Sequence, residues 1–81
     1  MALDTIEIRL LQVFDAIYKT RSVTEAAVSL DLGQPAVSVA LSKLRHHFDD
    51  QLFVRTSSGM EPTPFGEGLV RPVSGLSLIH I

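Results

Sequence analysis

The feature that most constrains the fold is a pair of helical patterns separated by only three residues. In the first pattern, the apolar side chains follow the i, i+3, i+4, i+7 spacing of an amphipathic helix: Val23, Ala26, Ala27 and Leu30. Ser22 and Glu25 form a capping box at its start. After a turn at residues 31–33, a second pattern begins at Gln34 and continues to about Phe48. The sequence therefore predicts a helix, a tight turn and a second helix.

The second of these helices has two unlike faces. Gly33 precedes it as a weak cap, and Pro35 lies in its first turn, where the missing N–H costs no hydrogen bond. At about 100° per residue, one narrow arc is apolar and predicts the core face: Val37, Leu41, Leu44 and Phe48. The opposite side holds Pro35, Val39, Ser42 and His46 and carries almost no charge. A solvated face more often holds Glu and Lys pairs, so this face is predicted to contact a partner.

The remaining elements follow from similar signals. A first helix is predicted from Asp4 to about Lys19. Residues 52–55 and 60–62 favour two short strands around a turn-rich segment, which predicts a small hairpin or wing. Thr63 can cap a fourth helix that continues to about Val73, although its glycines weaken that pattern.

Composition excludes several classes of protein. A chain of 81 residues is one domain, and the absence of cysteine excludes a disulfide scaffold, a thiolate metal site and a cysteine nucleophile. The net charge is −2, but residues 34–60 hold three basic against two acidic side chains, so an anion is expected there. The start of the chain lacks the basic region of a signal peptide, and no apolar run approaches the roughly 20 residues of a membrane span. We expect a cytoplasmic protein without a membrane partner.

No constellation predicts catalysis, a metal site or a cofactor. His46 and His47 are adjacent on a helix and point about 100° apart, so they cannot chelate one ion well. Asp49 and Asp50 have no nucleophile or ligand set beside them and are predicted to form a polar loop. We expect a protein that is not an enzyme.

The stretch from Ser22 to Thr63, SVTEAAVSLDLGQPAVSVALSKLRHHFDDQLFVRTSSGMEPT, resembles the N-terminal winged helix-turn-helix domain of LysR-type transcriptional regulators. Five pieces coincide in register: the AA pair, QPAVS, the following LxxL, LFVR and TPFGE. The resemblance implies a mainly α fold, a three-helix winged helix-turn-helix with a small β-hairpin wing and the start of a linker helix. It places the DNA-binding domain at residues 1–62 and the start of the linker helix at residues 63–75.

The resemblance also implies a sequence-specific DNA-binding domain that regulates transcription. Its third helix would enter the major groove of double-stranded DNA, and its wing would lie along the backbone or an adjacent minor groove. The residues implied to contact DNA are Gln34, Pro35, Ser38, Val39, Ser42, Lys43 and Arg55. Two positions depart from the family pattern: Gly33 stands where Ser or Thr is usual, and Val39 where Arg or His is frequent. These departures affect the operator sequence and leave the docking mode unchanged.

Members of this family also carry a complete linker helix, which pairs two subunits, and a larger domain that binds a small-molecule inducer. We therefore expect a homodimer for the full-length parent, and a mostly monomeric fragment with weak, salt-sensitive DNA binding. Residues 76–81, LSLIHI, are similar to the translation of an adaptor end used in sequencing libraries, which predicts a non-native tail. The alternative function is a helix-turn-helix module for protein–protein interaction without DNA binding, which suits the acidic net charge.

Overall fold

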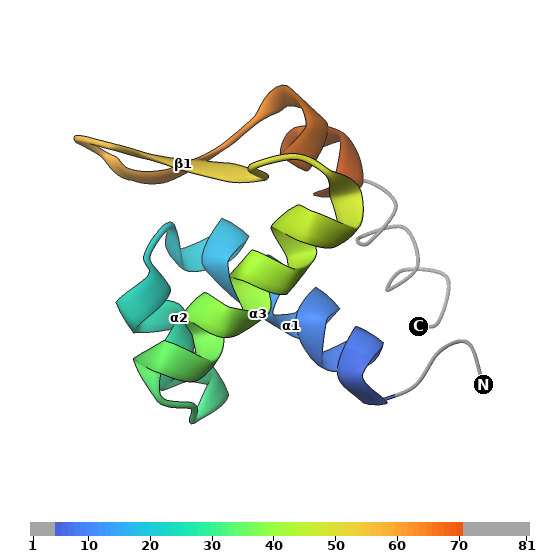
Figure 1. The fold of residues 1–81 in the computed structure, drawn as a ribbon. Helices are drawn as coiled ribbons and strands as arrows, with labels where there is room; N and C mark the ends of the chain where they lie inside the picture. Colours follow the sequence, from blue (N-terminus) through green and yellow to red (C-terminus); the bar gives the residue numbers. More distant parts are fainter. Residues whose placement is uncertain (1–4, 71–81) are drawn as a thin grey trace, which may run out of the picture.

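The computed structural model describes residues 5–70, and its elements occur in the predicted order. The helices are α1 (Thr5–Thr20), α2 (Val23–Leu30) and α3 (Gln34–Phe48), and they are followed by strands β1 (Phe53–Thr56) and β2 (Gly59–Pro62). Residues 64–70 form a further short helix. Figure 1 shows the three main helices crossing one another, with the hairpin projecting from one side of the helical body. The mainly α, winged helix-turn-helix architecture is confirmed.

The junction between α1 and α2 is closed by side-chain hydrogen bonds. Ser22 caps α2, because its Oγ accepts a hydrogen bond from the Glu25 N–H at 3.1 Å. The predicted return bond from Glu25 is replaced, since the Ser22 N–H donates to Thr20 Oγ1 at 3.2 Å. Asp31 then ends α2 in the left-handed conformation, with φ 57°. The turn into α3 is therefore as short as the spacing predicted.

The core is built from all three helices and both strands. Its buried members are Val13, Phe14, Ala16, Ile17, Val23, Ala26, Ala27, Val37, Leu41, Leu44, Leu52, Phe53 and Met60. The small side chains of Ala26 and Ala27 let neighbouring helices approach α2 closely, and α2 contacts both α1 and α3. Phe14 and Phe53 join α1 to the hairpin, with ring centroids 5.2 Å apart. The predicted core face of α3 is buried except at Phe48, which is half-buried and lies 5.8 Å from the Phe65 ring.

The hairpin starts one residue later than predicted. Leu52 has φ 67°, which is incompatible with an extended strand, and its side chain is fully buried. The strands pair in antiparallel register, with Arg55 opposite Met60 and Thr56 opposite Gly59. β2 also begins one residue earlier than predicted, at Gly59, whose φ of 117° suits glycine. The tight loop at the tip therefore joins strands of equal length.

The fourth helix begins where the Thr63 cap predicts. Thr63 Oγ1 accepts from the Gly66 N–H at 3.0 Å and donates to Asp50 Oδ2 at 2.7 Å. Gly66 lies against the Leu52 carbonyl, where a Cβ atom would be only 2.5 Å from the oxygen. The glycine that weakens the sequence pattern is thus required by packing. The predicted start at Asp4, the continuation to Val73 and the tail at residues 76–81 lie outside the described residues.

Within residues 5–70, none of the helices combines the length and the apolar character that crossing a membrane requires.

Candidate nucleic-acid interface

The exposed side of α3 carries two adjacent rows of side chains. Residues four apart on a helix lie one above the other, which gives a first row of Gln34, Ser38 and Ser42 and a second row of Pro35, Val39 and Lys43. All six side chains are exposed. The 15 residues of α3 include no carboxylate. This face therefore offers hydroxyl, amide and methyl groups to a partner without repelling an anion.

The first row begins beside α2. Thr24 Oγ1 donates a hydrogen bond to Gln34 Oε1 at 3.2 Å, which orients the Gln34 amide. The amide nitrogen keeps both of its donor hydrogens, and Oε1 keeps a second lone pair. Gln34 can therefore still donate and accept at once, although one side of its carbonyl is held by the protein.

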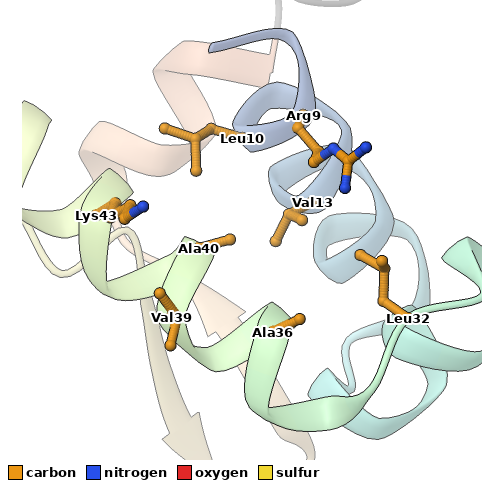
Figure 2. A pocket seen from close by; sticks show the side chains of 8 residues that line it. All are labelled: Arg9, Leu10, Val13, Leu32, Ala36, Val39, Ala40 and Lys43. Atoms are coloured by element: carbon orange, nitrogen blue, oxygen red, sulfur yellow. The ribbon is translucent and has the colours of Figure 1, made fainter. Parts of the chain in front are cut away.

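The second row borders α1. Figure 2 shows Val39 and Lys43 of α3 at the edge of a small groove, with Arg9 contributed by α1. The rest of the groove is apolar and is lined by Leu10, Val13, Leu32, Ala36 and Ala40. The first row therefore begins beside α2, and the second row lies beside the first half of α1.

Half of the described cations are engaged with the protein itself. Lys19 pairs with Asp15 at 3.0 Å, and Arg21 pairs with Glu61 at 3.1 Å. Arg45 donates from Nε to the Gln51 carbonyl at 2.8 Å and from Nη2 to the Phe53 carbonyl at 3.0 Å. All three side chains thus make polar contacts within the protein.

The other three cations in the described part of the chain form no such ion pair. Across residues 8–70, no carboxylate oxygen lies within 4.0 Å of the charged nitrogens of Arg9, Lys43 or Arg55. Sequence reasoning placed Lys43, and not Arg45, among the residues implied to contact DNA, and the structure shows Arg45 bonded to the Gln51 and Phe53 carbonyls. The same reasoning missed Arg9, because residues 1–33 are net acidic as a segment.

Arg55 lies on β1, two residues after Phe53. Side chains alternate along a strand, so Arg55 is on the same face of the hairpin as Phe53 and opposite Met60, both of which are buried. Arg55 itself is exposed, although its register partner Met60 belongs to the core. The bond from Arg45 to the Phe53 carbonyl fastens this strand to α3. The strand that carries Arg55 is therefore hydrogen-bonded directly to the helix that carries the two rows.

The remaining polar residues are explained by local structure. His46 and His47 are both exposed, and His47 lies edge-on to Phe48 at 4.8 Å. No cluster of three or more His, Cys, Asp or Glu side chains in the described part of the chain is placed to hold a metal ion. Asp50, predicted as an ordinary loop residue, accepts from the Leu52 N–H at 2.8 Å as well as from Thr63. Its position two residues before that N–H is the pattern of an Asx turn, which could have revealed part of this role.

These features define a winged helix-turn-helix domain: α2 and α3 are joined by a tight turn, one face of α3 is exposed, and a β-hairpin packs against the helices. Residues 8–67 match the family model of bacterial regulatory helix-turn-helix proteins of the lysR family. The chain belongs to this family.

Individual members of the family resemble this chain in sequence and in structure. The transcriptional activator NagR of Ralstonia sp is 49% identical over 73 residues, which is 90% of this chain and 24% of NagR. The crystal structure of a probable transcriptional regulator from Pseudomonas aeruginosa is 41% identical with a TM-score of 0.82, covering 86% of this chain and 24% of that one. The crystal structure of a BenM DNA-binding domain in complex with DNA is 31% identical with a TM-score of 0.80, and the match covers 86% of this chain and 79% of that one. The chain spans about a quarter of the length of the curated relatives it matches.

Proposed function

We propose that this chain is the sequence-specific DNA-binding domain of a LysR-type transcriptional regulator, with α3 in the major groove and the hairpin on the backbone or an adjacent minor groove. The observation that carries the proposal is the exposed, carboxylate-free face of α3, beside which Lys43 and Arg55 form no ion pair with any residue from 8 to 70. Its likeness to a BenM domain solved with DNA supports the same docking mode.

Base edges would be read mainly by the N-terminal half of α3. The Gln34 amide can pair with adenine through one donor and one acceptor, and its bond to Thr24 fixes the orientation in which it does so. Ser38 lies one turn further along the same row and can donate or accept. Val39 and Pro35 offer apolar contact, which suits a thymine methyl group. This division assigns sequence preference to Gln34, Pro35, Ser38 and Val39.

Phosphates would be held by the flanking residues. Lys43 and Arg55 supply the charge, and the Ser42 hydroxyl can donate to a phosphate oxygen or a base edge at the end of its row. Phosphate contacts release counterions, so they account for most of the affinity and for its dependence on salt.

The rest of the parent protein completes the proposal. Residues 1–62 form the DNA-binding domain, and residues 63–75 begin the linker helix, which the observed helix at residues 64–70 supports. We propose that the parent is a cytoplasmic homodimer that binds its inducer through a separate domain, and that this fragment is neither an enzyme nor cofactor-dependent. The tail at residues 76–81 is proposed to be non-native, which independent resequencing of the source locus would test.

A salt titration tests the proposed DNA binding against the alternative of a protein-interaction module. The probe is a labelled duplex that the chain itself enriches from a randomised pool, and the measurement is fluorescence anisotropy across a range of salt concentrations. Binding should weaken steeply with salt, and Lys43→Ala and Arg55→Ala should each reduce the slope of log K against log salt by about 1.

Lys19→Ala is the matched control, because Lys19 carries the same charge but is paired with Asp15 on α1. It should leave the slope nearly unchanged. No enrichment of any duplex, or an affinity independent of salt, would refute DNA binding and favour the protein-interaction module.

A further inference from the structure

Arg21 joins the α1–α2 junction to the hairpin through its backbone. It follows α1 in the left-handed conformation, with φ 59°, and its N–H donates to the Ile17 carbonyl at 2.6 Å. Its carbonyl then accepts from the Met60 N–H of β2 at 2.9 Å. This approach is so close that a Cβ atom at Gly59 would lie 2.7 Å from the Arg21 oxygen. The backbone of β2 is therefore bonded directly to the end of α1.

The Arg21 side chain holds the next residue of the same strand. Its Nη1 contacts Glu61 Oε1 at 3.1 Å, and its Nε donates to the Tyr18 carbonyl at 2.8 Å. The guanidinium also lies 4.8 Å from the centroid of the Tyr18 ring. The carbonyl and the ring of Tyr18 thus both contact the Arg21 guanidinium. Backbone and side chain of one residue hold consecutive positions of β2.

The hairpin depends on such contacts for its orientation. An isolated two-stranded hairpin is marginally stable in water, so contacts with the helices decide where it lies. Arg45 of α3 fastens β1, and Arg21 fastens β2. Because Met60 is paired with Arg55 across the hairpin, the position of β2 also sets the position of Arg55.

We propose that the Arg21–Glu61 pair is a positioning pair for DNA recognition, which holds the hairpin at the angle where Arg55 reaches the DNA backbone or minor groove. In this proposal the pair acts on DNA binding through the position of Arg55 and not through a DNA contact of its own. The proposal rests on the proposed function, since it requires that the domain binds DNA.

Glu61→Ala gives a test in which charge and position predict opposite results. Removing a carboxylate near a DNA-binding surface tightens DNA binding if only charge matters. Loss of the positioning pair should instead weaken binding to the enriched duplex, by about three-fold, the scale of a partly exposed ion pair. Asp15→Ala is the matched control, because it removes the same charge and also releases a cation, Lys19, from a surface pair. It should leave affinity unchanged or raise it.

Coupling to Arg55 distinguishes positioning from general stabilisation. In an Arg55→Ala background, Glu61→Ala should have almost no further effect, whereas independent contributions would multiply. Glu61→Gln keeps the acceptor oxygen and should retain most of the wild-type affinity. Circular dichroism at the assay temperature confirms that each variant is folded.

Two results would overturn the proposal while leaving the proposed function intact: tightening by Glu61→Ala equal to that by Asp15→Ala, or multiplicative effects of Glu61→Ala and Arg55→Ala. Failure of the proposed function is a separate observation, because the unmodified chain would then show no salt-dependent binding to any duplex.

Discussion

Gln34 and Ser38 contribute almost nothing to the fold. Both side chains are exposed on the first two turns of α3, and the only hydrogen bond either makes among the described residues is the one Gln34 accepts from Thr24. Their removal should therefore separate recognition from folding.

The double variant Gln34→Ala, Ser38→Ala should lose sequence preference and keep its stability. The ratio of affinities for the enriched duplex and a scrambled duplex should fall toward one, because a side chain that pairs with a base edge supplies about 1 to 3 kcal/mol of discrimination. The free energy of unfolding in urea should change by less than about 0.5 kcal/mol, as for most surface substitutions.

Gln12→Ala on α1 is the control, since Gln12 is an exposed glutamine that is not part of α3. Unchanged preference in the double variant would show that the exposed face of α3 does not read bases.

The elements themselves were largely predictable, because their signals are local. The caps at Ser22 and Thr63 lie within three residues of the N–H groups that they accept from, and the apolar arc of α3 repeats within one helix. The contacts that set the hairpin were not predictable, since Arg21 and Glu61 are 40 residues apart and Asp50 and Thr63 are 13 apart. No local pattern marks such pairs.

Two glycines in the helix at residues 64–70 have opposite roles. A Cβ atom on Gly66 would lie 2.5 Å from the Leu52 carbonyl, whereas nothing lies within 4 Å of one on Gly68. Gly66→Ala should therefore lower the free energy of unfolding by about 1 to 3 kcal/mol, through overpacking against backbone.

Gly68→Ala is its matched control and should raise that free energy by about 0.5 to 1 kcal/mol, because alanine favours a helix over glycine. Thermal and urea denaturation followed by circular dichroism measure both. Equal effects of the two substitutions would show that residues 64–66 do not pack against the loop as described.

The whole molecule carries a net charge of −2, so its attraction for DNA depends on where its cations lie. Three of the described cations are held by internal partners, which leaves few for phosphates. A single domain of this kind is expected to bind DNA weakly and to be monomeric.

Joining two copies by a flexible linker should restore tight binding. When both copies can reach a duplex with two half-sites, the affinity should exceed that of one copy by about 10²- to 10⁴-fold. Sedimentation establishes the oligomeric state, and anisotropy gives the affinity. A tandem with Lys43→Ala in one copy should lose part of the gain, whereas nanomolar binding by a demonstrated monomer would contradict the expectation.

Thr63 uses one hydroxyl for two purposes, since it accepts from the first turn of the following helix and donates to the loop after α3. Gly66 also packs against the Leu52 carbonyl of that same loop, so the helix and the loop are in contact at two points. A rotation of the helix at residues 64–70 would therefore be transmitted both to the end of α3 and to the start of the hairpin.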